Sequence, residues 1–145
     1  GEFNGLMLRV RELAEAEFDY ELSIPGTIRV PELGKLFRAT CLKVPADAVA
    51  LSVGPTRVLV DGDGLGAYVK IRNWKPGDYY KPAGWPAGKV KKLFQKARVP
   101  RSQRGSWPVF VSDSTIVWVT SFPVSREFTP SICTKKVVAF EALED

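Results

Sequence analysis

Residues 67–97 read AYVKIRNWKPGDYYKPAGWPAGKVKKLFQKA, and the spacing of apolar residues changes once within this stretch. Apolar and polar residues alternate over residues 67–72, which predicts a strand with one buried face and one outward face. Apolar residues then recur at helical spacing over residues 89–97, which predicts a short helix with one buried stripe. A turn at Pro76-Gly77-Asp78 and a loop rich in Pro, Gly and aromatic residues separate the two elements. The stretch therefore predicts a domain that mixes strand and helix.

The remainder of the chain predicts mostly strands. Short runs of apolar or alternating residues, bounded by Gly, Pro or polar turn residues, are typical of them. The predicted strands span residues 20–24, 27–30, 35–43, 48–53, 57–61, 108–111, 115–120 and 136–143. Apolar residues on one stripe between Leu6 and Ala14 predict a linker or packing helix over residues 4–19. The chain is therefore expected to be α+β and mostly β.

Length and composition are those of one globular domain. The 145 residues are 45% hydrophobic and 26% charged, which excludes disorder and collagen as the whole of the chain. No apolar run approaches the roughly 18–20 residues that span a bilayer, and the first residues lack the plan of a signal peptide. We therefore expect a cytoplasmic protein without a membrane partner. Residues 1–3 lack an initiator Met and are interpreted as a remnant of cloning.

Several kinds of chemistry lack the residues that they need. The sequence has no His, and Cys41 and Cys133 form no CxxC pair, which argues against a metal site or a catalytic triad. We expect two free thiols, with a single Cys41–Cys133 disulfide as the alternative. No GxxxxGK[ST] or Ser-Gly-Gly phosphate loop is present, and residues 61–66, DGDGLG, favour a turn over a calcium loop. The residues predict a binding module with no catalytic residue and no cofactor of its own.

Basic residues gather in the second half of the chain. The net charge is +5, but residues 70–104 hold 11 Lys and Arg residues against one acid, Asp78. Tryptophans and tyrosines lie between these cations. Such a segment attracts a polyanion through phosphate contacts and counterion release. We therefore favour nucleic acid as the partner over a merely solvated surface.

Seven pieces of residues 69–128, in order and spacing, resemble the C-terminal domain of tRNA(Ile)-lysidine synthetase. They are a strand with basic residues at 69–72, Pro76-Gly77-Asp78, a glycine loop at 84–88, a Lys-rich Leu-Phe helix at 89–94, Pro-Arg-x-x-Arg at 100–104, a Pro-led strand at 107–109 and a Trp-Val strand at 116–119. Residues 20–40 are similar, more weakly, to the strands that precede this domain in the family. Tyr79-Tyr80 and Thr120-Ser121 depart from the family's usual basic-aromatic pair and glycine.

The resemblance implies a fold and a role. The family's domain is a β-sandwich with an added helix, similar to a domain of the phenylalanyl-tRNA synthetase β chain, and residues 20–145 would form it. In the full-length family enzyme, an ATP-dependent ligase, an N-terminal PP-loop ATPase domain uses ATP and Mg²⁺ to adenylate cytidine 34, and lysine then displaces AMP. The substrate is the isoleucine tRNA with the anticodon CAU, which the C-terminal domain holds near the acceptor stem. Without the phosphate loop, this chain alone is expected to be the non-catalytic, tRNA-binding fragment.

The resemblance and the charge pattern together indicate candidate tRNA-binding residues. They are Lys70, Arg72, Lys75, Lys89, Lys91, Lys92, Lys96, Arg98, Arg101 and Arg104. Three of them, Lys89, Lys92 and Lys96, share one face of the predicted helix and are called the lysine ridge below. The remaining acid of the segment, Asp78, is expected to cap a turn or to hold a nearby arginine.

Aromatic side chains are the second group of candidates. Trp74 and Trp85 are candidates for stacking on an unpaired base, whereas core packing is favoured for Trp107, which precedes a strand. Two alternatives stay open at this point: another kind of nucleic-acid-binding module, and a protein–protein docking domain whose basic face meets an acidic partner. The expected partners are the isoleucine tRNA and the N-terminal catalytic domain of the parent chain, with homodimer formation left open.

Overall fold

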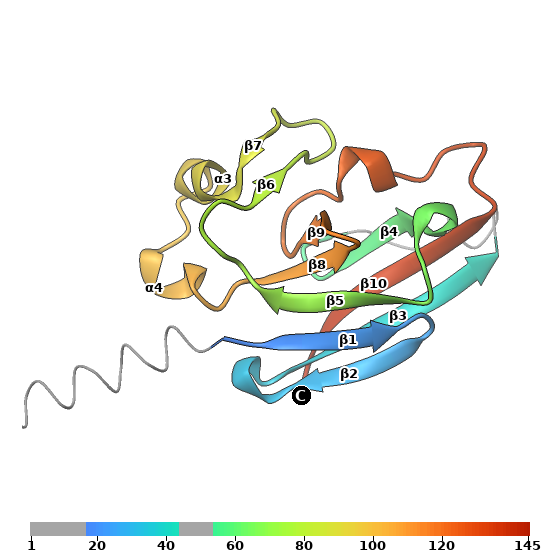
Figure 1. Cartoon of the computed structure of the whole chain (residues 1–145), viewed down its shortest axis with the longest axis horizontal. Helices are drawn as coiled ribbons and strands as arrows, with labels where there is room; N and C mark the ends of the chain where they lie inside the picture. The colour runs from blue at the N-terminus through green and yellow to red at the C-terminus, as the bar shows by residue number, and fades with distance from the viewer. Residues whose placement is uncertain (1–16, 44–53) are drawn as a thin grey trace, which may run out of the picture.

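The computed structural model describes residues 17–43 and 54–145, which are drawn in colour in Figure 1. The helix expected over residues 4–19 lies outside the described residues apart from its last three positions, and Asp19 already begins a strand. The strand expected over residues 48–53 also lies outside them. Every other predicted strand is present, within one or two residues of its expected ends.

The eight long strands form two four-stranded antiparallel sheets (Figure 1). Sheet A contains, in order across the sheet, β1 (Asp19–Ser23), β5 (Tyr68–Asn73), β8 (Pro108–Ser112) and β9 (Thr115–Val119). Sheet B contains β2 (Gly26–Val30), β3 (Lys35–Lys43), β10 (Lys136–Glu144) and β4 (Arg57–Asp61). In the middle of sheet B, β10 pairs with β3 along its whole length, so the last strand of the chain joins the first half to the second.

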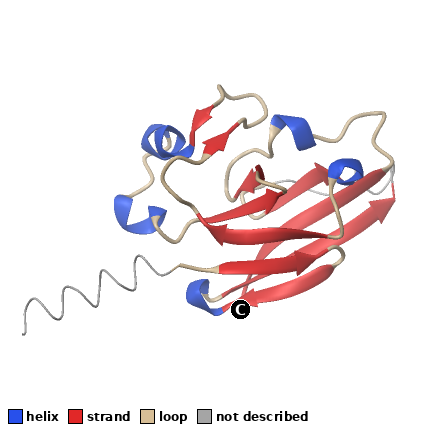
Figure 2. Ribbon diagram, viewed as in Figure 1, coloured by secondary structure: helices blue, strands red, loops and turns tan. Residues whose placement is uncertain are grey.

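The remaining elements are short and lie outside the two four-stranded sheets (Figure 2). They are the paired strands β6 (Tyr79–Tyr80) and β7 (Gly88–Lys89), the helices α3 (Val90–Lys96) and α4 (Arg101–Arg104), and the 3-10 turns η1 (Pro31–Leu33), η2 (Gly62–Gly64) and η3 (Arg126–Phe128). The prediction of a mostly β chain with a short lysine-rich helix is confirmed.

The inner faces of the two sheets form the first hydrophobic core. Phe110 of sheet A and Phe37 and Phe140 of sheet B are completely buried in it. The ring centroid of Phe110 lies 5.6 Å from that of Phe37 and 4.8 Å from that of Phe140. Because buried aromatic rings dominate the energetics of a core, these contacts hold the sheets face to face. The predicted sandwich of layers is confirmed.

Strands β8 and β9 are buried on both of their faces. Phe110 and Trp118 pair across the two strands and face sheet B, whereas Val109 and Val119 pair with each other and face a second core. The second core is completed from outside the sheets by Tyr80, Val90, Phe94, Val99 and Phe122. Burial on both faces explains why β8 and β9 are nearly continuous apolar runs in the sequence.

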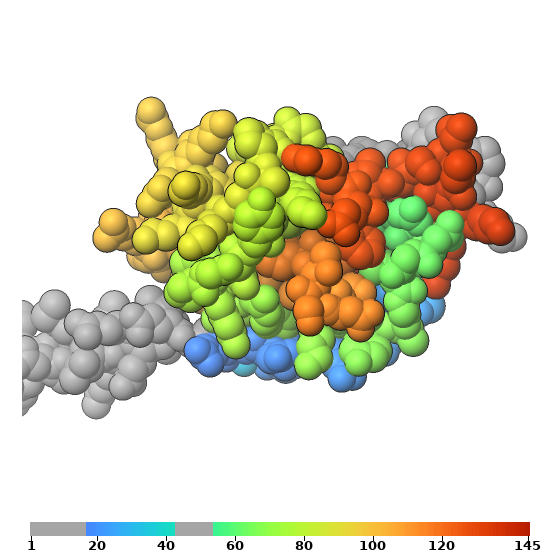
Figure 3. Space-filling model, turned by 45° about the horizontal axis from the view of Figure 1, so that its top comes forward, coloured from blue at the N-terminus to red at the C-terminus, as the bar shows by residue number. Residues whose placement is uncertain are grey.

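Residues 79–104, called the α3 lobe below, cover this outer face of sheet A (Figure 3). The helix α3 contributes the apolar stripe that its sequence predicts, since Val90 and Phe94 are completely buried. The ring of Phe94 lies 5.4 Å from that of Trp74 and 5.2 Å from that of Trp107. The lobe is therefore anchored to the sandwich by a core of its own.

Candidate nucleic-acid interface

The α3 lobe carries seven of the ten predicted tRNA-binding cations. They are Lys89, Lys91, Lys92, Lys96, Arg98, Arg101 and Arg104, called the α3–α4 cations below. No acidic residue occurs in the sequence between Asp78 and Asp113. Within residues 17–43 and 54–145, none of the seven forms an ion pair with a carboxylate. Their charges are therefore available to an external polyanion.

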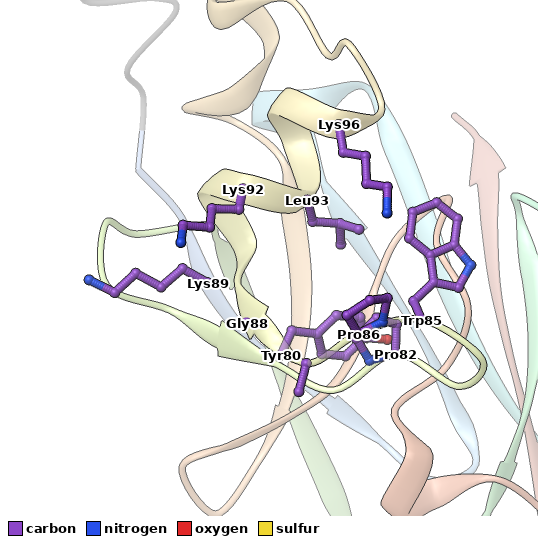
Figure 4. A pocket seen from close by; sticks show the side chains of 10 residues that line it. Tyr80, Pro82, Trp85, Pro86, Gly88, Lys89, Lys92, Leu93 and Lys96 are labelled. Atoms are coloured by element: carbon purple, nitrogen blue, oxygen red, sulfur yellow. The ribbon is translucent and has the colours of Figure 1, made fainter.

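The lysine ridge lines part of a hollow beside α3 (Figure 4). Lys92 and Lys96 project from the helix, whereas Lys89 is the residue before it, so the ridge belongs to the strand–helix junction and not to the helix alone. All three lysines line the hollow, with the amino groups of Lys89 and Lys92 on one side of it and that of Lys96 on the other (Figure 4). The hollow has a volume of about 150 Å³, and its lining is mostly apolar. Its other lining residues are Tyr80, Pro82, Trp85, Pro86, Ala87, Gly88 and Leu93.

Trp85 is the tryptophan of this hollow. The Nζ atom of Lys96 lies 5.8 Å from the centroid of the Trp85 ring, within the range of a cation–π contact. The Phe122 ring supports the indole almost at right angles, with the centroids 6.3 Å apart. Trp85 therefore combines a fixed aromatic surface with a neighbouring cation, as its predicted role in base stacking requires.

The loop that carries Trp85 is fastened to a distant part of the chain. The backbone N–H of Arg126 donates to the carbonyl of Lys81, and its Nη2 donates to the carbonyl of Trp85, both at 2.7 Å. The buried hydroxyl of Tyr80 donates to the carbonyl of Pro123. Burial raises the pKa of Tyr80 well above its ordinary value, so the hydroxyl keeps its proton. No sequence pattern indicates these contacts, because their partners lie about 40 residues apart along the chain.

The arginines that follow α3 are placed by the way in which the helix ends. The N–H of Val99 donates to the carbonyl of Phe94 at 2.9 Å, while Arg98 adopts a left-handed conformation with φ of 59°. The Nε of Arg104 donates to the carbonyl of Val99 at 3.0 Å, so this side chain also stabilises the junction between α3 and α4. Arg101 is exposed and makes no hydrogen bond to the described residues through its side chain.

The cations on the outer face of β5 have acidic neighbours. Arg72 makes a two-pronged ion pair with Asp78, in which Nη1–Oδ2 is 2.9 Å and Nη2–Oδ1 is 3.1 Å. The two side chains are only 19% and 13% exposed. Across the sheet, Arg72 lies opposite Asp19 of β1, and Lys70 lies opposite Glu21. The guanidinium of Arg72 is therefore already paired with a carboxylate, and its role in tRNA binding stays a prediction.

Asp78 also organises the turn that follows β5. Its carboxylate accepts a hydrogen bond from the N–H of Lys75 at 2.9 Å, and its own N–H donates to the carbonyl of Lys75 at 3.1 Å. Gly77 adopts a φ of 96°, which the third position of such a Pro-Gly turn requires. Both roles predicted for Asp78, capping a turn and holding an arginine, are confirmed. Lys75 is exposed, beside this carboxylate.

Two of the tryptophans discussed above, Trp74 and Trp107, pack against the second core. Trp74 packs edge-on against Phe94, and its Nε1 is buried without a hydrogen-bond partner among the described residues. The Nε1 of Trp107 donates to the carbonyl of Thr120 at 2.8 Å. The packing predicted for Trp107 is confirmed. The stacking role of Trp74 stays a prediction, and Trp85 is the tryptophan that lines the hollow.

Other clusters that the sequence suggested have structural roles. The carboxylate of Asp63 accepts hydrogen bonds from the N–H groups of Lys135 and Lys136 at 2.8 and 2.9 Å, so the Asp-Gly-Asp-Gly stretch is the predicted turn. Cys41 and Cys133 are exposed free cysteines, as predicted. Within the described ranges, His, Cys, Asp and Glu form no group of three that could hold a metal ion. The described helices are all too short to cross a membrane.

Comparison with known proteins connects this geometry with a family. The sequence profile described as TilS substrate C-terminal domain matches residues 69–139. A tRNA(Ile)-lysidine synthase of Symbiobacterium thermophilum is 31% identical over 120 residues, covering 82% of this chain and 24% of that protein. The enzyme of the same name from Shouchella clausii is 35% identical over 116 residues, covering 76% and 23%. That of Caldanaerobacter subterraneus is 26% identical over 141 residues, covering 96% and 30%.

A solved structure shares the fold. The structure described as the crystal structure of TILS C-terminal domain superimposes with a TM-score of 0.74, covering 88% of this chain and 97% of that chain at 19% identity. The fold is therefore that of a TilS C-terminal domain. The chain belongs to the family of TilS substrate C-terminal domains. It spans about a quarter of the length of the tRNA(Ile)-lysidine synthases that it matches.

Proposed function

We propose that this chain is the non-catalytic, tRNA-binding part of a tRNA(Ile)-lysidine synthase, and that the α3–α4 cations hold the tRNA. One observation carries the proposal: seven cations without a described acidic partner gather on one lobe of a TilS substrate C-terminal domain. The relatives are named tRNA(Ile)-lysidine synthases, and this name suggests an isoleucine tRNA as the RNA that is bound. The charge and exposure of the lobe provide the means of binding it.

The lobe is suited to a double-helical stem. Proteins contact RNA duplexes mainly through phosphates and 2′-hydroxyls, because the deep major groove is closed to side chains. Val90 and Phe94 fix α3 to the second core, so its lysines are presented from a rigid support. Phosphate contacts set position and orientation but carry no sequence information. The acceptor stem, a regular duplex, is the part of a tRNA that we assign to this surface.

In the parent enzyme we assign the reaction to the part of the protein outside this chain. The present chain corresponds to about a quarter of the length of its relatives. We place ATP, Mg²⁺ and the adenylation of cytidine 34 in an N-terminal catalytic domain in the cytoplasm. The isoleucine tRNA with the anticodon CAU is the substrate in this scheme. The chain described here holds its acceptor stem while that domain reacts.

Salt titrations with three polyanions test the binding role. Affinity is measured against salt concentration for isoleucine tRNA, for a DNA duplex and for heparin. We expect tRNA to bind most tightly, with log affinity falling linearly against log salt at a slope no steeper than about −6, because seven cations are available. Equal affinity for heparin, or binding that does not respond to salt, would overturn the proposal in favour of docking to an acidic protein.

A second measurement tests the absence of catalysis in this chain. Incubation with tRNA, ATP and lysine should release no AMP above a blank without protein, because the sequence has no phosphate loop. AMP release that rises with protein concentration would show a catalytic site within these 145 residues.

A further inference from the structure

We propose that the hollow beside α3 takes one unpaired nucleotide of a bound RNA, with its base on the Trp85 ring and its phosphate at Lys89 and Lys92. The inference rests on the proposed function, because it requires an RNA on the α3–α4 cations. It adds a ligand of a different class, a single-stranded nucleotide, which phosphate contacts along a duplex do not explain.

The lining of the hollow has the two parts that a nucleotide needs. Leu93, Pro82 and Pro86 are apolar lining residues, and the three lysines of the ridge line the hollow as well. No carboxylate lines the hollow. Its volume of about 150 Å³ equals that of an apolar cavity that admits a benzene ring. A nucleotide joins a flat aromatic ring to a phosphate, so both parts of the lining are used at once.

The lysines lie where a stacked nucleotide would present its phosphates (Figure 4). Lys96 points toward the Trp85 ring, whereas the amino groups of Lys89 and Lys92 lie on the opposite side of the hollow. A base on the indole therefore directs its sugar and phosphate across the hollow toward Lys89 and Lys92. Lys96 then leaves the ring face and meets the neighbouring phosphate.

A base is expected to displace Lys96 from the Trp85 ring, because base stacking is stronger than an exposed cation–π contact. An exposed cation over an aromatic ring strengthens an interaction by roughly 2- to 5-fold. A base stacked on an aromatic side chain strengthens binding by roughly 5- to 150-fold. Lys96 keeps its charge near a phosphate after the exchange, so the base gains the ring without loss of the cation.

The ring is held in place before any ligand arrives. The carbonyl of Trp85 accepts a hydrogen bond from Arg126 Nη2 at 2.7 Å, and the Phe122 ring packs nearly perpendicular to the indole. Because little of the loop has to be ordered on binding, most of the stacking free energy is available as affinity.

The groove beside β5 does not have these properties. It is larger, about 600 Å³, and contains Lys70 and Arg72, but Asp19 and Asp113 line it as well. Two carboxylates repel a phosphate, and Tyr68 is the aromatic residue of its lining. The hollow of the α3 lobe is therefore the site that we assign to an unpaired nucleotide.

The experiment compares a blunt-ended RNA duplex with the same duplex carrying a short single-stranded extension. For the unaltered protein, the extension should raise affinity roughly tenfold. Trp85→Leu should abolish this gain while leaving affinity for the blunt duplex and its salt dependence unchanged. Trp85→Phe keeps an aromatic ring and should restore part of the gain. Tyr79→Leu is the matched control, since Tyr79 is 54% exposed on the same small sheet but does not line the hollow.

Each outcome decides for or against the site. An equal gain from the extension in the unaltered protein and in Trp85→Leu overturns the inference, as does no gain at all. If Trp85→Leu does not fold, the Trp85→Phe variant decides by the same criterion. Failure of the blunt duplex to bind refutes the proposed function, and binding of a short single strand alone then tests the hollow independently. Displacement of that strand by an acidic peptide with no Trp85 dependence assigns the lobe to a protein partner and overturns the inference.

Discussion

Four basic side chains of sheet B and the α3–α4 cations lie on the surface of the same domain, but their neighbours differ. In sheet B the ion pairs are Arg29–Asp145, Lys35–Glu144, Arg38–Glu141 and Arg57–Glu141, with N–O distances of 2.9–3.2 Å. Among the described residues, the α3–α4 cations have no such partner. The first group is neutralised within the protein, and the second is not.

The comparison teaches that a nucleic-acid-binding surface is located more by where the acidic residues lie than by the number of basic residues. A cation that already has a carboxylate contributes little to phosphate binding, because its charge is compensated before the ligand arrives. Sheet register brings these partners together: Glu141 lies opposite Arg38 on β3 and opposite Arg57 on β4. The outer face of β5 is intermediate, because Arg72 is paired with Asp78 and Lys70 lies opposite Glu21.

The largest effect is expected from the lysine ridge. Replacing Lys89 and Lys92 by Gln removes two uncompensated charges while Val90 and Phe94 keep the helix on its core. The slope of log affinity against log salt for isoleucine tRNA should flatten by roughly 1.5 to 2 units. Fluorescence anisotropy with labelled tRNA measures the slope, and thermal unfolding confirms that the variant is folded.

The matched control removes the same charge from the β5 side of the domain. The control variant combines Lys70→Gln with Lys75→Gln. Each of these lysines has a carboxylate nearby, Glu21 for Lys70 and Asp78 for Lys75. We expect less than half the change in slope that the α3 variant shows. Equal changes in the two double variants would break the comparison, because net charge alone would then govern binding.

The next effect is a difference in the free energy of unfolding between a variant of the paired Arg72 and a variant of the exposed Arg101. Arg72→Gln leaves the largely buried carboxylate of Asp78 without its two-pronged partner, and should lower the free energy of unfolding by about 2 kcal/mol. Arg101→Gln, at an exposed site, should change it by less than about 0.5 kcal/mol. Urea denaturation measures both. A stable Arg72→Gln variant would mean that the pair contributes nothing to folding.

A smaller effect is expected at the end of α3. Arg98 has a φ of 59°, a region in which a residue with a Cβ is strained by about 1 kcal/mol and glycine is not. Arg98→Gly should raise the free energy of unfolding by about 0.5 kcal/mol and flatten the salt slope for tRNA by roughly 0.9 units or less. Denaturation and anisotropy on the same sample measure the two changes. Loss of stability in this variant would show that the arginine side chain holds the helix end.

The smallest effect is a pH dependence in sheet B. Burial alone would raise the pKa of Glu141, but hydrogen bonds from Arg57 and Arg38 outweigh burial and hold the pKa below its ordinary value of 4.5. The ionised carboxylate therefore stabilises the fold above its ordinary pKa, and this contribution is lost as the pH falls through the lowered value. Glu141→Gln should flatten the curve of unfolding free energy against pH in the acid range. Superimposable curves for the two proteins would exclude this contribution.

Periodicity predicted the elements whose signals are local. The alternation of residues 67–72 became β5, and the stripe of residues 89–97 became α3, with Val90 and Phe94 in the second core. The segment Arg101–Arg104 was not predicted as a helix, because RSQR contains no apolar residue and lies between a proline and a glycine. Strands β6 and β7 were not predicted either, because each has two residues and exists only by pairing across a Pro/Gly-rich loop.

The candidate site was predictable as a set of charges but not as a set of neighbours. The run of basic residues indicated all seven α3–α4 cations, since no long-range contact is needed to count them. The pairing of Arg72 with Asp78 was within reach, because the two residues are six apart. The position of Asp19 opposite Arg72 and the bonds from Arg126 to the Trp85 loop depend on how distant segments meet. The periodicity of a single sequence contains no information on which distant segments come into contact.

The two-sided burial of β8 and β9 also has a mechanical consequence. Val109 and Val119 seal the α3 lobe, and Phe110 and Trp118, on the same two strands, seal the sandwich. Melting the lobe alone would expose apolar surface of the strands on which the sandwich depends, so both should unfold as one cooperative unit and amide protons of α3 should exchange only with global opening. The sandwich and the α3 lobe then move as one rigid body. Any contact that orients the sandwich within a longer protein therefore also orients the basic surface.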